Sequence, residues 1–236
     1  KRSLRFNSAD SSKLSHTFSL GNIRIWTWSG WVKRNSLGVA QSVFGSPDTG
    51  NTTDIEFDSS DRLIFTDGAS TYAQTTALFK DPSAWYHIVC AHDTTQNIAS
   101  ERVKLYVNGV LQPVTLQTYG WNSSSDVGTA AAHTIGSSKD VYSNTTLADV
   151  QYIDGMALAP AAFGSFDSTG LWKPKAFALP TPNDGTTWSS KVTGSAEGAH
   201  PKTSAFDGGV DQSGDFVTYA YPSAGGTLTF TPDDPI

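Results

Sequence analysis

The sequence is poor in cysteine, in charge and in long apolar runs. Its 236 residues include 1 Cys and 1 Met, and charged residues make up 16% of the chain, against about 25% in an average globular protein. The single Cys90 excludes an internal disulfide. No run approaches the roughly 18 apolar residues of a membrane-spanning helix, so we expect no membrane insertion. A helical bundle or coiled coil would need far more Glu, Lys, Leu and Ala.

Aromatic residues, in contrast, are plentiful. They make up 11% of the chain and include 7 Trp, which excludes a disordered protein. The formal net charge is −6, and the Lys and Arg residues are scattered along the chain. A nucleic-acid partner is therefore not expected.

Alternation of apolar and polar residues with a period of two recurs along the whole chain and predicts an all-β protein. Helical periodicity is nearly absent, and only 160–166 is predicted as a short helix, opened by Pro160. Asn108-Gly109 and Asp154-Gly155 each predict a two-residue hairpin turn. The expected strands lie near residues 3–6, 15–19, 24–33, 41–45, 53–58, 62–67, 71–76, 85–93, 101–107, 110–115, 133–137 and 146–154.

The composition changes after about residue 173, which predicts two units. Residues 1–175 carry enough strands for an antiparallel sandwich, and the prolines near 174–182 indicate a linker, placed at 176–185. Residues 186–236 are expected to form a small β module that is truncated or leans on a neighbour, because about 50 residues make a thin core. The start at Lys1 and the end at Ile236 led us to expect a processed piece of a longer polypeptide.

Several segments, taken in order, resemble the concanavalin A-like lectin/glucanase superfamily, in its laminin-G-like and pentraxin-like branch. They lie within residues 1 to about 175: Ser3-Leu-Arg-Phe-Asn7, Thr27-Trp-Ser-Gly-Trp-Val-Lys33, Asp61-Arg-Leu-Ile-Phe65, Trp85-Tyr-His-Ile-Val89, Val103-Lys-Leu-Tyr-Val-Asn-Gly109 and Leu147-Ala-Asp-Val-Gln-Tyr-Ile153. The resemblance implies a jelly-roll β-sandwich.

Two stretches are more narrowly similar to lectin-like domains in virion proteins of tailed, notably marine, bacteriophages. They are Trp28-Ser-Gly-Trp-Val-Lys-Arg34 and Ala162-Phe-Gly-Ser-Phe-Asp-Ser-Thr-Gly-Leu-Trp-Lys-Pro174. The tail segments Ala205-Phe-Asp-Gly208 and Gly226-Thr-Leu-Thr-Phe-Thr-Pro232 resemble the small β modules that follow such domains. This resemblance implies a protein assembled in the host bacterial cytoplasm and displayed on the virion, with other virion proteins and further copies of itself as partners.

Three carboxylates at Asp54, Glu56 and Asp58 fall on one face of a predicted strand. Laminarinase-type glycosidases of the same superfamily carry Glu, Asp and Glu on such a strand, with the carboxyl groups about 5 Å apart. The order here is Asp, Glu, Asp. We therefore expect Ile55 and Phe57 to face the core, a solvated acidic face outside, and no catalytic residue.

Tryptophan occurs on both faces of the strand near 24–33, with Trp26 and Trp28 on one face and Trp31 on the other. Core packing is the favoured interpretation for all three, because Trp is mostly buried. The alternative is that Trp31 lines a surface on which sugars stack.

The long segment from Gln112 to His133 contains the best candidate site. Its aromatic residues Tyr119 and Trp121 stand beside Asn122 and Asp126. A sugar packs its C–H face on an aromatic ring and bonds its hydroxyls to such polar groups, so these four residues are the predicted ligand-binding set. The alternative is that the two rings pin the loop or contact a neighbouring subunit.

No metal site is predicted. Asp207, Asp211 and Asp215 in a Gly-rich turn leave calcium open, but their spacing differs from that of an EF-hand loop. The resulting hypothesis is a non-enzymatic tail fibre or particle appendage whose lectin-like domain binds a host-surface glycan, without a cofactor. A purely structural module of the virion and a laminarinase-type hydrolase are the alternatives.

Overall fold

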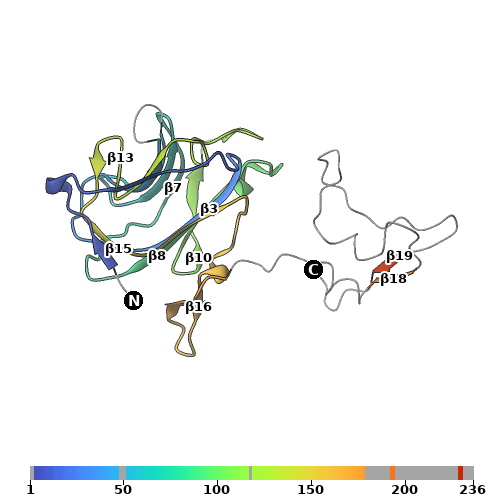
Figure 1. Ribbon diagram of the computed structural model, residues 1–236. Helices are drawn as coiled ribbons and strands as arrows, with labels where there is room; N and C mark the ends of the chain where they lie inside the picture. Colours follow the sequence, from blue (N-terminus) through green and yellow to red (C-terminus); the bar gives the residue numbers. More distant parts are fainter. Residues whose placement is uncertain (1–2, 48–51, 117–118, 179–191, 195–227, 231–236) are drawn as a thin grey trace. The chain divides into compact units, whose positions relative to one another are not determined.

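The computed structural model describes residues 3–47, 52–116, 119–178, 192–194 and 228–230 (Figure 1). The chain divides into two units, Lys1–Phe177 and Ala178–Ile236. In the second unit, β18 (Val192–Gly194) pairs antiparallel with β19 (Leu228–Phe230). Most of the predicted linker at 176–185 and most of the predicted module at 186–236 lie outside the described residues.

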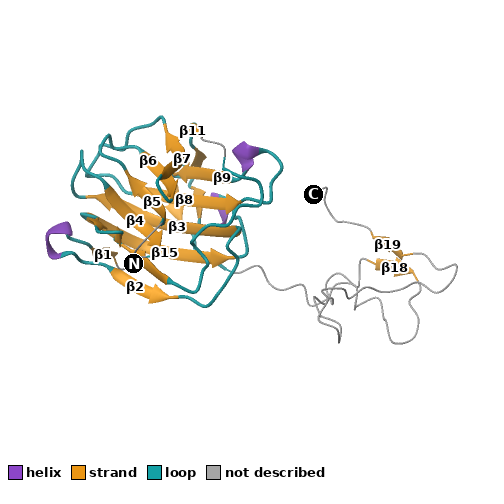
Figure 2. Cartoon of the chain, turned by 90° about the horizontal axis from the view of Figure 1, so that it is seen from above, coloured by secondary structure: helices purple, strands orange, loops and turns teal. Residues whose placement is uncertain are grey.

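The first unit is a β-sandwich of two antiparallel sheets, seen in two views in Figures 1 and 2. The six-stranded sheet has the order β1 (Ser3–Arg5), β15 (Thr145–Asp154), β3 (Ile25–Arg34), β8 (Tyr86–Asp93), β9 (Val103–Val107) and β10 (Val110–Leu111). The seven-stranded sheet has the order β11 (Val114–Leu116), β7 (Ser70–Thr75), β6 (Leu63–Asp67), β5 (Thr53–Phe57), β4 (Gln41–Ser46), β12 (Ala132–Ile135) and β2 (Leu14–Thr17). The predicted jelly-roll sandwich is confirmed.

The described residues of this unit also form two short hairpins and three 3-10 helices. The hairpins are β13 (Ser137–Ser138) with β14 (Val141–Tyr142), and β16 (Gly164–Phe166) with β17 (Trp172–Pro174). The helices are η1 (Ser8–Asp10), η2 (Ala99–Glu101) and η3 (Pro160–Ala162). The predicted helix at 160–166 is thus one short turn, because Gly164 already pairs in β16.

The core forms where the inward residues of the two sheets meet. Trp26, Trp28 and Val32 of β3 are fully buried there, opposite Ile55 and Phe57 of β5. Alternation accounts for this, because successive side chains of a strand point to opposite faces. Cys90 of β8 belongs to the same core, and its burial raises the pKa of the thiol.

The two predicted hairpin turns have different outcomes. Asn108 and Gly109 have φ of 50° and 81° and connect β9 to β10, which confirms the first turn. The second prediction is wrong: Gly155 has a positive φ and Asp154 does not, and β15 pairs with β1 and β3. Beyond Gly155 the chain crosses the outer face of β3, where Thr27 Oγ1 donates to the Met156 carbonyl oxygen at 2.6 Å.

Candidate functional site

The β16–β17 hairpin stands outside both sheets (Figure 1). It carries Trp172, whose indole contacts His87 on β8 of the six-stranded sheet. Asp167 shapes its turn, because Oδ1 accepts hydrogen bonds from the backbone N–H of Thr169 (2.9 Å) and of Leu171 (3.0 Å). Phe166 pairs with Trp172, and the two rings meet edge to face with centroids 4.8 Å apart. The hairpin therefore presents Trp172 in a fixed orientation.

Trp172 is anchored to the sheet by a buried histidine. Its indole Nε1–H donates to Nδ1 of His87 on β8 at 3.0 Å. Because Nδ1 is the acceptor, Nε2 of the neutral ring carries the proton and donates to Ser29 Oγ, also at 3.0 Å. His87 is only 1% exposed, so this chain of hydrogen bonds is shielded from water.

The turn between β9 and β10 fits around the same tryptophan. A Cβ atom at Gly109 would lie 2.5 Å from the Trp172 ring, so glycine is needed there for space as well as for its positive φ. The neighbouring Asn108 Oδ1 accepts from the backbone N–H of His87 at 2.8 Å. One tight turn thus secures both the histidine and the tryptophan.

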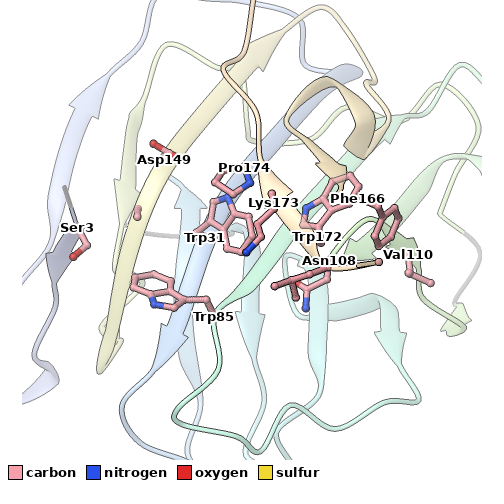
Figure 3. A pocket seen from close by; sticks show the side chains of 13 residues that line it. Ser3, Trp31, Trp85, Asn108, Val110, Asp149, Phe166, Trp172, Lys173 and Pro174 are labelled. Atoms are coloured by element: carbon pink, nitrogen blue, oxygen red, sulfur yellow. The ribbon is translucent and has the colours of Figure 1, made fainter. Parts of the chain in front are cut away.

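Beside this anchor lies a groove of about 810 Å³ with mostly apolar walls. In the view of Figure 3, Trp31 lies between Trp85 and Trp172. Trp31 and Trp85 are both half-buried, which leaves part of each indole open to the groove. The full lining is Ser3, Trp31, Trp85, Asn108, Val110, Ala148, Asp149, Phe166, Gly170, Leu171, Trp172, Lys173 and Pro174.

Trp31 corrects a sequence prediction. Trp26 and Trp28 are in the core as expected, but Trp31 points to the opposite face of β3 and lines the groove. Core packing is therefore wrong for Trp31, and the alternative of a surface-lining ring holds. The reason is that the outer face of this sheet is only partly covered, by a small cluster around Val89, Ile153 and Phe163.

The groove joins two sequence stretches that lie far apart in the chain. Residues 28–34 contribute Trp31, and residues 162–174 contribute Phe166, Trp172 and Lys173. The sequence could not indicate that they meet, because β8, β9 and the Asn108-Gly109 turn bring them together.

The predicted ligand-binding loop is arranged differently from the expectation. Tyr119 is 4% exposed, and its ring packs edge to face on Phe65 and Tyr72. Its hydroxyl donates to Asp67 Oδ2 at 2.7 Å. Trp121, in contrast, is 63% exposed and donates its indole N–H to the Thr95 carbonyl oxygen at 3.2 Å. The two rings therefore do not form the expected pair, because Trp121 is exposed and Tyr119 belongs to the core.

The remaining two residues of that set lie in different surroundings. Asn122 is exposed with φ of 57°, and its carbonyl oxygen accepts from Arg24 Nε at 3.0 Å. Asp126 lies near Asp54 and Asp67, two carboxylates of the seven-stranded sheet. Burial, with Asp67 and Asp54 nearby, raises the pKa of its carboxyl group. The structure therefore does not gather the four predicted residues around one ring pair.

The carboxylate triplet is also only partly as predicted. Ile55 and Phe57 face the core as expected. The outer face is not fully solvated, however, because Asp54 is 8% exposed and Thr52 Oγ1 donates to its Oδ2 at 2.6 Å. Burial, followed by the charges of Asp54 and Asp58, raises the pKa of Glu56 to about 7. Asp58 pairs with Arg62 Nε at 2.7 Å, which ties it to the turn before β6.

In the described part of the chain, no group of three or more His, Cys, Asp or Glu residues is placed to hold a metal ion. Asp207, Asp211 and Asp215, the residues that left calcium open, lie outside the described residues. Among the helices that are described, none is long and apolar enough to cross a membrane.

Sequence reasoning missed Trp85 and Trp172 as groove residues, and His87 as the residue that anchors Trp172. Trp85 and His87 stand in one of the segments that carried the family resemblance, and Trp172 stands in another. The parity of β3 was the available signal, since it put Trp31 on the outer face. The hydrogen bond from Trp172 to His87 joins residues 85 positions apart, and no local pattern indicates it.

Known structures with a similar fold include enzymes and a pentraxin. A sialidase of Trypanosoma rangeli in complex with sialic acid superposes with a TM-score of 0.43 and 15% identity, over 58% of this chain and 22% of that chain. A native heptameric SAP-like pentraxin from Limulus polyphemus gives 0.41 and 16%, over 59% and 68%. Domain 4 of the GH43 extracellular arabinanase AbnA of Geobacillus stearothermophilus, in complex with arabinotriose, gives 0.43 and 20%, over 60% and 66%. A search of curated proteins found no match.

The sandwich has the fold of a lectin-like domain. Residues 6–162 match the family described as the Concanavalin A-like lectin/glucanases superfamily, which is more than half of the chain. The chain belongs to this superfamily. Because the family description includes both lectins and glucanases, membership alone leaves binding and hydrolysis open.

Proposed function

We propose that this protein is a non-enzymatic glycan-binding protein and that it binds sugar in the groove formed by Trp31, Trp85 and Trp172. The observation that carries the proposal is one groove of about 810 Å³ in which the half-buried indoles of Trp31 and Trp85 lie beside the buried indole of Trp172. Sugar rings pack their C–H faces on indoles, and rigid aromatic surfaces lose little entropy on binding. A volume of this size accommodates a short oligosaccharide.

The biological setting we propose is a phage particle. The two stretches that resemble phage virion domains, residues 28–34 and 162–174, both contribute residues to the lining of the groove. In this setting the protein is a tail fibre or another particle appendage, present in several copies beside other virion proteins. The groove then faces the glycans of the host surface.

Assembly is the second candidate function, and the rim of the groove supports it. Phe166, Leu171 and Val110 line the groove, and each exposes more than half of its side chain. Exposed apolar residues that gather in one place often mark protein contacts. In this alternative the groove holds a neighbouring virion protein in place of a sugar.

Hydrolysis is the third candidate, and Glu56 is the residue that would carry it. A carboxyl group with a pKa of about 7 is suited to act as a general acid. The pKa of its neighbour Asp54 is also raised, chiefly by burial, so neither group is the strongly ionised nucleophile that a retaining glycosidase needs. We therefore expect no turnover.

The test compares alanine variants of the two candidate aromatic sites on a glycan array and on host polysaccharides. Trp31→Ala and Trp85→Ala should lose glycan binding, whereas Trp121→Ala, at an exposed tryptophan outside the groove, should retain it. Loss of binding in Trp121→Ala alone would assign recognition to the predicted loop and overturn the groove. Wild-type protein that binds no glycan, but whose groove variants fail to enter particles, would establish the assembly role. Melting curves of each variant check that it is folded.

A further inference from the structure

The hydrogen-bonding groups that line the groove are unequally divided between donors and acceptors. Asn108 uses its acceptor internally, because Oδ1 accepts from the backbone N–H of His87 at 2.8 Å. Within the described part of the chain, no group accepts from its Nδ2. Asn108 therefore offers the groove two free N–H donors, whereas its Oδ1 already accepts one hydrogen bond.

The indoles and a lysine add further donors. The N–H of Trp172 is used by His87, but those of Trp31 and Trp85 have no acceptor among the described residues. The ammonium group of Lys173 lies 3.9 Å from Asp167 and is half-exposed, so it remains available to a ligand. Donors thus come from four side chains along the groove.

Acceptors are few and lie elsewhere. Apart from Asn108 Oδ1, which already accepts from His87, the acceptor oxygens of the lining side chains belong to Ser3 and Asp149, and Figure 3 shows both on the side of Trp31 away from Trp172. Asp149 already interacts with another group of the chain. Around Asn108 and Trp172, donors are therefore combined with the apolar surfaces of Val110, Phe166 and Leu171.

We propose that the groove selects sugars that carry N-acetyl groups. This inference rests on the proposed function, that the groove binds glycans. An acetamido group has a carbonyl oxygen, which accepts from Asn108 Nδ2 or Lys173 Nζ, and a methyl group, which packs on the neighbouring apolar walls. A hydroxyl at the same sugar position is smaller and supplies no methyl group, so it leaves the apolar surface wet. A carboxylate would satisfy the donors but would place a charge against apolar walls.

The central experiment measures binding of three tetrasaccharides to the full chain by isothermal titration calorimetry. Chitotetraose and cellotetraose share the same β-1,4-linked backbone and differ in the acetamido group, and tetragalacturonate supplies carboxylates. We expect chitotetraose to bind about tenfold more tightly than cellotetraose, the factor that corresponds to one good hydrogen bond with its packed methyl group. Tetragalacturonate should bind no better than cellotetraose.

Asn108→Asp is the sharpest variant, because it replaces the Nδ2 donor and keeps Oδ1 for the His87 N–H. Asp-Gly also supports the same type of turn, so the fold should be unchanged. We expect the preference for chitotetraose to fall to about threefold or less, with an unchanged melting temperature. Asn97→Asp, the same exchange at an exposed position outside the groove, should keep the full preference.

The outcomes separate this inference from the proposed function. Equal affinity for chitotetraose and cellotetraose, lost for both in Trp31→Ala, would leave a glycan-binding groove and overturn N-acetyl selectivity. Tighter binding of tetragalacturonate would overturn it in favour of acidic sugars. A protein that binds none of the three, nor any array glycan, would refute glycan binding itself and the selectivity with it.

Discussion

Trp172 donates its indole N–H to Nδ1 of His87 at 3.0 Å, and this bond ties the hairpin to the sheet. The same ring donates from Nε2 to Ser29, so both nitrogens of the neutral imidazole have partners of the right kind. His87 also lies 4.9 Å from the Trp31 ring, measured between centroids. One buried histidine therefore sets the positions of two of the three indoles in the groove.

Replacing His87 should loosen this arrangement. In His87→Phe the ring volume is retained, but the Trp172 N–H and the Ser29 hydroxyl lose their partners, so we expect the free energy of unfolding to fall by about 1 to 3 kcal/mol. His87→Asn, which restores an acceptor near the Nδ1 position, should recover part of the loss. Urea denaturation measures both. Equal stability of the wild type and His87→Phe would contradict the anchoring role.

Gly109 and Gly155 form a matched pair for testing the contact with Trp172. Both have positive φ, but a Cβ at Gly155 would meet nothing within 4 Å, whereas one at Gly109 would lie 2.5 Å from the Trp172 ring. Gly155→Ala should cost about 1 kcal/mol, from backbone strain alone. Gly109→Ala should cost at least about twice as much, and tryptophan fluorescence should report a displaced indole. Similar losses in the two variants would mean that Trp172 moves aside freely.

Glu56 should make the stability depend on pH. Its pKa is raised from 4.5 to about 7, so between these values the folded protein binds more protons than the unfolded chain. The contribution of Glu56 is therefore favourable at low pH and is lost as the pH rises from 4.5 to 7. Glu56→Gln should be more stable than the wild type above pH 7, by on the order of 2 to 3 kcal/mol, and the difference should vanish near pH 4.

The same variant tests catalysis. Incubation of the wild-type protein with laminarin and host polysaccharides should release no reducing ends. Turnover in the wild type that disappears in Glu56→Gln would replace the binding function with hydrolysis.

The role of the loop around Trp121 as a contact with a glycan or a neighbouring subunit stays a prediction. Because Trp121 is 63% exposed, Trp121→Ala should change the free energy of unfolding by only about 0.5 kcal/mol. If the loop is the main contact with a glycan or a neighbouring subunit, the same variant should lose about 2 kcal/mol of binding or assembly free energy. Tyr119→Phe should do the opposite: it removes the donor to Asp67 Oδ2, while Thr53 Oγ1 still donates to Oδ1, and so lowers stability by about 1 kcal/mol.

Local patterns in the sequence predicted the strands well. The period of two in β3 and β5 assigned Trp26, Trp28, Ile55 and Phe57 to the core, and Asn108-Gly109 predicted its turn, because these features depend on neighbouring residues alone. Asp154-Gly155 failed as a hairpin because Thr27, far away in the sequence, binds the segment that follows it. Asp154-Gly155 and Asn108-Gly109 have similar local patterns, and the two segments differ in their long-range partners.

The candidate site was less predictable than the fold for the same physical reason. Tyr119 and Trp121 are two residues apart and both aromatic. Tyr119 packs on Phe65 and donates to Asp67, whereas Trp121 is exposed to solvent. Nothing in the loop itself distinguishes them. Trp31 could be assigned to the outer face of its strand, but whether that face is covered depends on the course of residues 155–177, which pass over one part of the sheet and leave the rest open.

The buried Cys90 has a practical consequence for following ligands in solution. It is the sole cysteine of the chain, and its thiol lies in the core with a raised pKa, so alkylating dyes should react with it very slowly. A cysteine introduced at Leu171, on the exposed rim of the groove, would then take a fluorophore at one known position. Its emission would report when a molecule enters the groove, without any background label to subtract.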